Sequence, residues 1–206
     1  AGQYACLADI KLVVRGGKVI SRSLSGEVES FGSENYDTAM EEAFKSDYEK
    51  VRDFNASHVG EVKKDLVSRE FYYRQCDYMN FLHALAFSAW PVDISLSATL
   101  LIDGKVPAGE VRYQDIRKIY PYDNKLIVLR LTGAEILRYL EASYDAWIST
   151  VPGPAEGTHV LRITQTKDYA TGGLKWKLAK SPANFDSAAG IRYTVDVTKP
   201  YGSRVT

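Results

Sequence analysis

Apolar residues recur three or four positions apart in three long stretches of the chain, as on one side of a helix. The stretches are residues 36–55, 69–90 and 132–147. Asp37 is suited to cap the first stretch, and Pro91 ends the second because proline cannot continue a helix. Thr132 and Glu135 form a Thr-x-x-Glu capping box at the start of the third. The pattern therefore predicts three amphipathic helices, each with one face towards a core.

Shorter apolar or alternating runs between these stretches predict β-strands. Residues 3–28 alternate around a Gly-Gly pair, which is a hairpin signal, and the polar residues 21–35 are expected to form a linker. The run 126–131, interrupted by Arg130, is typical of a mostly buried strand. Further strands are predicted at residues 60–66, 92–101, 160–164, 174–178 and 191–197.

Helices and short strands that alternate along one chain, joined by both short and long connections, favour an α+β fold. We therefore expect a mixed β-sheet packed with helices. A length of 206 residues suits one domain with an appended piece and allows a substantial core.

The sequence Tyr-Pro-Tyr-Asp-Asn at residues 120–124 predicts a turn directly before the 126–131 run. Proline fixes its own φ and restricts the residue before it, while Asp and Asn bond readily to nearby backbone. The turn leaves Tyr120, Tyr122 and Asn124 at the mouth of a strand–helix corner. From these residues alone, Tyr122 either stacks on a ligand or packs over the corner, and Asn124 either bonds a ligand or caps the turn.

Charge and cysteine content narrow the classes of partner. Lysine plus arginine equals aspartate plus glutamate at 26 each, so the formal net charge is zero. A nucleic-acid polymer would favour a basic face, and we expect no such partner. No apolar run reaches the roughly 18 residues that span a bilayer, so no membrane span is expected. Cys6 and Cys76 lack Cys-x-x-Cys spacing and are expected to be free, mostly buried thiols.

Two groups of motifs carry a family resemblance. The first is Pro-Tyr-Asp-Asn-x-Leu at residues 121–126, followed by Leu-Thr-Gly-x-Glu-Ile and Tyr-Leu-Glu. The second is Gly-Ile-Arg-Tyr-Thr-Val-Asp-Val-Thr-Lys-Pro-Tyr-Gly-Ser-Arg at residues 190–204. Together they resemble the C-terminal domain of the 5'-nucleotidase family, whose usual turn is Pro-Phe-x-Asn. That family includes periplasmic UDP-sugar hydrolases and the 2',3'-cyclic-nucleotide phosphodiesterase/3'-nucleotidases, and the resemblance covers roughly residues 61–206.

The resemblance implies a domain organisation. Residues 1–30 would be a hairpin and linker left from a preceding metallophosphatase domain, and residues 31–206 a nucleotide-specificity domain that lacks the family's C-terminal end. The resemblance further implies that the parent protein is bacterial and periplasmic or extracellular, and that an N-terminal metallophosphatase domain is the partner of this one.

The resemblance also implies the substrate contacts. In the family, the aromatic residue of the Pro-Phe-x-Asn turn stacks on the nucleobase and the asparagine bonds the base edge. These positions are Tyr122 and Asn124 here, with Tyr120 beside them. Arg69 is the better match for a phosphate-binding arginine at the start of a helix and Arg74 a poorer one, because a guanidinium fork fits phosphate oxygens. From the residues alone, each is equally consistent with a solvated residue at a helix start. Ser95 begins the segment that replaces a second family arginine, and we include it among the substrate-binding candidates.

Hydrolysis in the family takes place at a two-metal centre, whose ligands lie in Asp-x-His, Gly-Asn-His-Glu and Gly-His-x-His motifs. None of these motifs occurs in this sequence, and His58, His83 and His159 stand isolated. His83 lies in the predicted core helix and is expected to be a packed, hydrogen-bonded histidine. We therefore expect no catalytic residue, metal or cofactor in this chain, whereas the parent enzyme would need divalent metal ions.

The resulting hypothesis is a domain that binds the nucleoside or nucleotide of a secreted nucleotidase. Because it lacks the second arginine, this sequence resembles the 2',3'-cyclic phosphodiesterase/3'-nucleotidase branch more than typical 5'-nucleotidases. Such a domain would support phosphate-ester hydrolysis only together with a separate metal-bearing domain. The alternatives are a non-catalytic interaction or structural domain that keeps the fold without a nucleotide pocket, and a standalone hydrolase.

Overall fold

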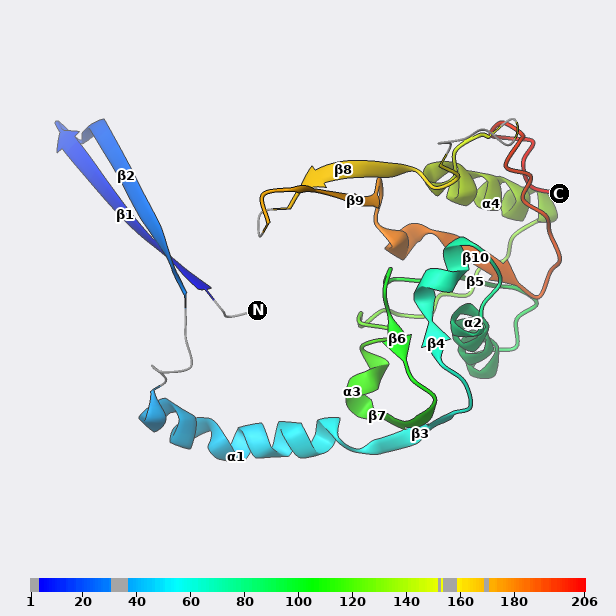
Figure 1. Cartoon of the computed structure of the whole chain (residues 1–206), viewed down its shortest axis with the longest axis horizontal. Helices are drawn as coiled ribbons and strands as arrows, with labels where there is room; N and C mark the ends of the chain where they lie inside the picture. Colours follow the sequence, from blue (N-terminus) through cyan, green and yellow to red (C-terminus); the bar gives the residue numbers. More distant parts are fainter. Residues whose placement is uncertain (1–3, 31–36, 152, 154–158, 169–170) are drawn as a thin grey trace. The chain divides into compact units, whose positions relative to one another are not determined.

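The computed structural model describes residues 4–30, 37–151, 153, 159–168 and 171–206 of the chain (Figure 1). Contacts between residues divide the chain into two compact units, Ala1–Asp53 and Phe54–Thr206. This division lies C-terminal to the domain boundary predicted at residues 30 and 31. That residues 1–30 derive from a metallophosphatase domain stays a prediction.

The first unit opens with the β-hairpin that the sequence predicts. Strands β1 (Tyr4–Arg15) and β2 (Lys18–Ser30) pair in antiparallel fashion. Gly16 and Gly17 form the connecting turn with φ of +57° and +74°, a left-handed geometry that glycine adopts without a steric penalty. The predicted linker is wrong for residues 21–30, because their backbone pairs with β1 in spite of their polar side chains. The rest of that linker lies outside the described residues.

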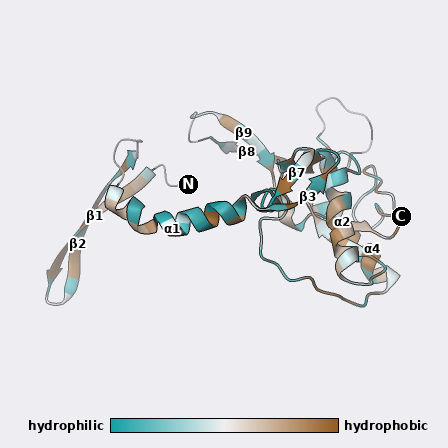
Figure 2. Cartoon of the chain, turned by 90° about the horizontal axis from the view of Figure 1, so that it is seen from below, coloured by the Kyte–Doolittle hydropathy of each residue, from teal (hydrophilic) through white to brown (hydrophobic). Residues whose placement is uncertain are grey.

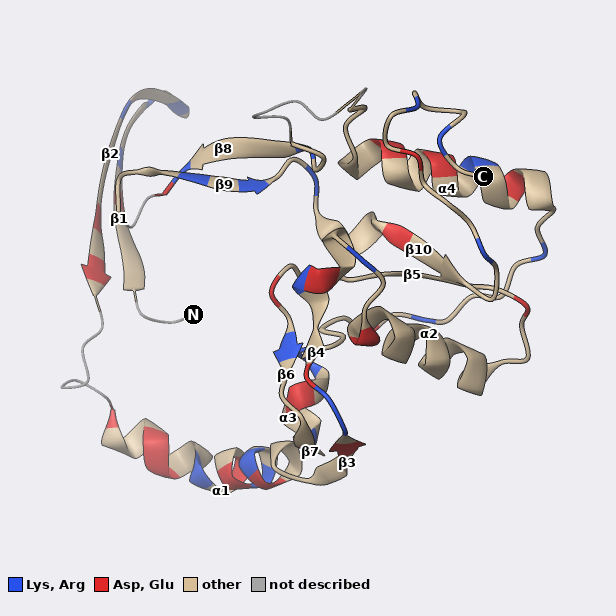
Figure 3. Cartoon of the chain, turned by 45° about the vertical axis from the view of Figure 1, so that its right-hand side comes forward, with Lys and Arg blue, Asp and Glu red and all other residues tan. Residues whose placement is uncertain are grey.

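Helix α1 (Thr38–Asn55) confirms the first predicted helix. Asp37 caps it as expected, since its Oδ1 accepts hydrogen bonds from the backbone N–H groups of Ala39 at 2.9 Å and Met40 at 3.1 Å. Acidic and basic side chains are interspersed along α1 (Figure 3). None of its described residues is buried, so mainly local interactions stabilise the helix in this structure.

The second unit combines short antiparallel strand pairs with helices. The strand pairs are β3 (His58–Val62) with β7 (Gly109–Arg112), β4 (Leu66–Val67) with β6 (Lys105–Val106), β5 (Ser95–Ala98) with β10 (Asp186–Ala189), and β8 (Ile163–Lys167) with β9 (Leu174–Leu178). The helices are α2 (Asp77–Ala89), α3 (Tyr113–Ile116) and α4 (Gly133–Trp147), with the 3-10 turns η1 (Ser68–Tyr72) and η2 (Pro182–Asn184). Helix and strand take nearly equal shares, 31% and 32%, which confirms the predicted α+β class.

Two hydrophobic clusters form the core of this unit. Helix α2, rich in hydrophobic residues (Figure 2), packs on β5 and supplies Tyr78, Met79 and Leu82 to the first cluster. Helix α4 packs on β10 and supplies Trp147 to the second cluster. There the ring of Phe185 is stacked on Trp147 with centroids 5.2 Å apart. Helix α2 thus packs on β5 and helix α4 on β10, the two strands of one antiparallel pair.

Several predicted elements differ in the structure. Residues 126–131 are not a buried strand: they belong to no strand, and all their side chains are exposed. Within the described chain their backbone has no strand to pair with, so the apolar run does not become a ladder. The strand predicted at 191–197 is reduced to a bridge between Val195 and Val205. Strand β10 (Asp186–Ala189) was not predicted, because two of its residues are polar and the other two are alanines, so it lacks the β-branched and aromatic residues typical of strands.

Both cysteines are free, as predicted, but their burial differs. Cys76 is buried in the first cluster, whereas Cys6 is exposed on the hairpin. The prediction of buried thiols is therefore wrong for Cys6, because the described residues provide no cover over that strand.

A buried polar contact joins helix α4 to the chain end. The Glu141 carboxylate accepts hydrogen bonds from the backbone N–H groups of Gly202 at 2.9 Å, Arg204 at 2.6 Å and Val205 at 2.7 Å. The fully buried Arg204 side chain donates to the carbonyl of Ile148 at 3.2 Å, at the end of α4, where a cation is favoured. The Tyr-Leu-Glu and Gly-Ser-Arg motifs are thus two halves of one structural contact.

Candidate functional site

The Tyr-Pro-Tyr-Asp-Asn turn lies on the surface of the second unit. Tyr122 keeps 51% of its surface exposed, so its ring is available for contact with a ligand. The side-chain Nδ2 of Asn124 donates a hydrogen bond to the hydroxyl of Tyr120 at 3.0 Å. The ring of Tyr120 in turn packs against the first hydrophobic cluster. The turn therefore presents one open aromatic ring beside an amide that is held by an anchored tyrosine.

Tyr78 fixes the base of this turn from inside the core. Its side chain is fully buried on α2, and its hydroxyl donates to the carbonyl of Ile119, directly before the turn, and to the carbonyl of Thr99 at 2.9 Å. Burial raises the pKa of the Tyr78 hydroxyl, which therefore stays protonated and able to donate. Tyr78 ties two segments of the chain to α2, and one of them leads into Tyr120 and the exposed Tyr122.

A strained turn adjoins the same anchor. Leu100 has a φ of +59°, which is unusual for a residue with a side chain, and the N–H of Leu101 bonds the carbonyl of Thr99 at 2.6 Å. Such a conformation costs about 1–3 kcal/mol and persists where the surroundings fix it. Here the hydroxyl of Tyr72 contacts the Thr99 hydroxyl at 3.1 Å, and Tyr78 holds the Thr99 carbonyl.

Arg69 lies on η1 and pairs with Asp103. Its Nε and Nη2 both approach Asp103 Oδ1 at 2.6 Å, and both side chains are largely exposed. The pairing is fixed by the neighbouring backbone, where Ser68 Oγ accepts from the N–H of Gly104 at 2.8 Å. A Cβ on Gly104 would lie 2.7 Å from the carbonyl of Lys118, so this turn runs close to the segment that leads into the tyrosines. Any anion that binds Arg69 competes with the Asp103 carboxylate.

Ser95 is the candidate whose side chain turns away from the surface. It is buried on β5, and its hydroxyl contacts His83 Nδ1 at 2.9 Å. His83 Nε2 contacts the hydroxyl of Ser187 on β10 at 3.1 Å. This agrees with the predicted packed, hydrogen-bonded histidine and links α2 to both strands. The role of Ser95 in substrate binding stays a prediction, and its hydroxyl is engaged inside the protein.

Burial lowers the pKa of the His83 imidazole, because the interior disfavours its charged form. The unfolded chain then binds this proton more readily than the folded one, so the stability contributed by neutral His83 is present above pH 6.5 and decreases as the pH falls below it. We expect the free energy of unfolding to decrease between pH 7.5 and 5.5, measured by urea denaturation. The decrease should be smaller in His83→Asn and unchanged in His58→Gln, an exposed control. Equal pH slopes in all three proteins would contradict this.

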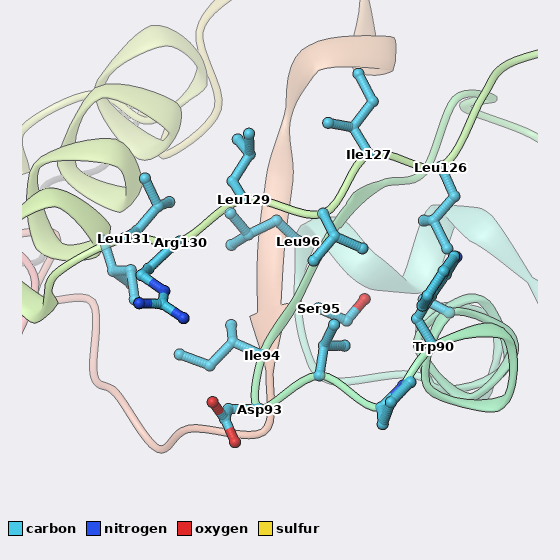
Figure 4. Close-up of a pocket in the computed structure, with 15 residues that line it drawn as sticks. Trp90, Asp93, Ile94, Ser95, Leu96, Leu126, Ile127, Leu129, Arg130 and Leu131 are labelled. Atoms are coloured by element: carbon cyan, nitrogen blue, oxygen red, sulfur yellow. The ribbon is translucent and has the colours of Figure 1, made fainter.

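Residues 126–131, which follow the candidate turn in the sequence, line an open groove. It has a volume of about 590 Å³ and is lined by residues 90–96 and 126–131, together with Ala86 and Ile136 (Figure 4). Its walls are mainly aliphatic, with Trp90, Asp93 and Arg130 among the lining residues (Figure 4). Tyr122 is not part of its lining, so the groove and the aromatic turn are distinct features.

The described residues contain no cluster of three or more His, Cys, Asp or Glu groups that could hold a metal ion. The isolated positions of His58, His83 and His159 in the sequence correspond to separate places in the fold, on β3, on α2 and before β8. In the same part of the chain no helix is both long and apolar enough to cross a bilayer.

Taken together, the described residues form an α+β domain with an exposed aromatic and amide turn. The family "5'-nucleotidase, C-terminal domain" matches residues 58–206. This match covers most of the chain, and it agrees with the position of both motif groups. The chain therefore belongs to the C-terminal domain family of the 5'-nucleotidases, within the nucleotidase and phosphoesterase proteins.

Two individual proteins with similar sequences support the same family. The chain is 30% identical over 95 residues to the trifunctional nucleotide phosphoesterase protein YfkN of Bacillus subtilis (strain 168), covering 46% of this chain and 6% of that protein. It is 25% identical over 96 residues to the 2',3'-cyclic-nucleotide 2'-phosphodiesterase/3'-nucleotidase of Yersinia enterocolitica, covering 47% of this chain and 13% of that protein. The aligned part is thus a small share of each relative.

A solved structure supports the fold. A Staphylococcus aureus protein described as a 5'-nucleotidase, in complex with alpha-ketoglutarate, superimposes with a TM-score of 0.67 at 17% identity. The superposition covers 98% of this chain and 36% of that protein.

Proposed function

We propose that this domain binds the nucleoside part of a phosphate-ester substrate, while hydrolysis takes place on a separate metal-bearing domain of the parent protein. The observation that supports it most is the half-exposed ring of Tyr122 with the Asn124 amide two residues away. An exposed aromatic ring can stack on any type of nucleobase, and a side-chain amide can pair with the edge of a base as donor or acceptor. Nucleosides and nucleotides are thus the proposed ligands.

The phosphate is proposed to lie towards Arg69. Because the guanidinium of Arg69 is already paired with Asp103, a phosphate there would have to displace a carboxylate. We also propose that the partner domain holds divalent metal ions and that the parent protein is periplasmic or extracellular.

Truncation of the stacking ring tests the proposal. In Tyr122→Ala, affinity for adenosine should fall by roughly tenfold, because stacking contributes about 1–3 kcal/mol per base. The measurement is an NMR titration of the 206-residue chain with adenosine up to millimolar concentration. Tyr73→Ala, at a tyrosine that is 74% exposed on another segment, is the matched control and should bind adenosine as the unmodified chain does. Equal affinity in Tyr122→Ala and the unmodified chain would rule out the stacking role.

A second candidate function is a domain that interacts with another polypeptide without a nucleotide pocket. The exposed aliphatic residues of 126–131 and the groove beside them favour it, since contiguous exposed apolar surface often marks an interaction site. A folded chain whose spectrum does not respond to any nucleoside would support this candidate against the first.

A further inference from the structure

The apolar run at residues 126–131 has a backbone without partners on either edge. Within the described chain it belongs to no strand, and its N–H and carbonyl groups make no hydrogen bond to another residue. Leu126, Ile127, Val128 and Leu129 are each more than half exposed. Successive side chains of an extended segment point to opposite sides, so both faces of the run are bare as well. Yet a nearly continuous run of Leu, Ile and Val is typical of a strand that is buried on both faces.

The groove beside the run has a second unpaired strand on its opposite wall. Strand β5 pairs with β10 along one edge, and no other described strand pairs with it. Ser95 and Leu96 of β5 line the groove on one side, and the run stretches along the other (Figure 4). Ala86 and Trp90, from the end of α2, and Ile136 of α4 also belong to the lining. The groove therefore offers a position for one further strand between two unpaired backbones, with contacts to both helices.

We propose that the chain forms a dimer in which the apolar run of each copy enters the groove of the other copy. The strand order through the dimer is β10, β5, the run of the second copy, the run of the first copy, and then β5 and β10 of the second copy. The two runs are antiparallel about a two-fold axis, so a single contact fills both grooves. Each run gains a partner on both edges, and each β5 gains its second partner. A sheet of six strands is of ordinary size for a protein.

The run has the properties that an occupant of the groove needs, because it is apolar on both faces and both of its edges are free. Strands β1 and β2 also carry exposed aliphatic side chains, but each already uses one edge to pair with the other.

The surface available is sufficient for a stable dimer. Stable interfaces bury about 800 Å² on each partner. Burial of one aliphatic side chain removes roughly 60–120 Å² from water. The five aliphatic side chains of the run, together with the groove walls that receive them, supply an area of this order. Tyr122 does not line the groove, so this interface goes beyond nucleoside binding and is independent of it.

Sedimentation equilibrium of the 206-residue chain tests the dimer, in the presence of a reductant that excludes a disulfide through the exposed Cys6. The mass of two chains is expected at about 10 μM, within the affinity range of interfaces of this size. In Val128→Lys an ammonium group would enter the middle of the joined sheet, and the dissociation constant should rise at least about thirtyfold. Val59→Lys is the matched control, because Val59 on β3 is 53% exposed, as Val128 is, and it should keep the dimer.

Amide hydrogen exchange locates the interface within the chain. Residues 126–131 and strand β5 should exchange more slowly in the dimer than in the diluted monomer, because their N–H groups gain partners. Ile127→Lys, on the opposite face of the run, is the second variant if Val128→Lys does not fold by circular dichroism. A chain that stays monomeric at about 100 μM overturns the proposal. A dimer that survives these substitutions, or one whose run exchanges as fast as in the monomer, overturns it as well.

Discussion

Glu141→Gln is expected to lower the free energy of unfolding by about 3 kcal/mol, because one neutral amide cannot accept all three backbone hydrogen bonds that the carboxylate accepts. Burial by itself would raise the pKa of Glu141, but the N–H groups of Val205, Gly202 and Arg204 and the charge of Arg204 outweigh burial and lower it. The carboxylate is therefore charged at neutral pH. In Glu141→Gln, the side-chain NH₂ group that replaces one carboxylate oxygen would face backbone N–H donors in a buried site.

Thermal unfolding followed by circular dichroism measures this effect. A loss of about 3 kcal/mol lowers the Tm of a unit of this size by roughly 6–12 °C. Glu61→Gln is the matched control, since Glu61 is exposed on β3, and it should leave the Tm within about 2 °C. Unfolding of Glu141→Gln at the same temperature as the control would show that the contact between α4 and the chain end contributes little.

The elements that the sequence predicted correctly are those set by neighbouring residues. The capping box of α4 forms as predicted, with the N–H of Thr132 bonding Glu135 Oε2 at 2.7 Å. The Gly-Gly hairpin and the Asp37 cap are also local features. The prediction of a strand at residues 126–131 was wrong because a strand requires a partner strand, and the sequence pattern does not indicate whether one is available.

For the candidate site, the sequence and the family resemblance pointed to Tyr122 and Asn124 in one turn, and the structure shows both exposed. Their roles in binding stay predictions. Sequence reasoning missed Tyr78 and Asp103, because each acts on a partner more than twenty residues away. The only available signal for Tyr78 was its place on the apolar side of the second predicted helix, where a tyrosine needs a buried partner for its hydroxyl.

Tyr78→Phe is expected to lower the free energy of unfolding by about 1–3 kcal/mol, because it leaves the carbonyl of Ile119 without its donor inside the core and leaves the Thr99 carbonyl with the N–H of Leu101 alone. Phenylalanine keeps the packing of the ring, so the loss reports the hydroxyl alone. Ile119 leads directly into Tyr120, and a weaker anchor there should also lower adenosine affinity roughly threefold if that turn is the binding site.

Urea denaturation and the adenosine titration together separate the two effects of Tyr78→Phe. Tyr73→Phe removes a hydroxyl from an exposed ring and should change neither quantity. Tyr78 lies in the core and touches no ligand in the proposed arrangement. If Tyr78→Phe lowers the affinity for adenosine, the substitution therefore acts through the backbone of residues 119–124. A large loss of stability with unchanged affinity would show that the turn keeps its shape without this anchor, and that Tyr78 serves the core alone.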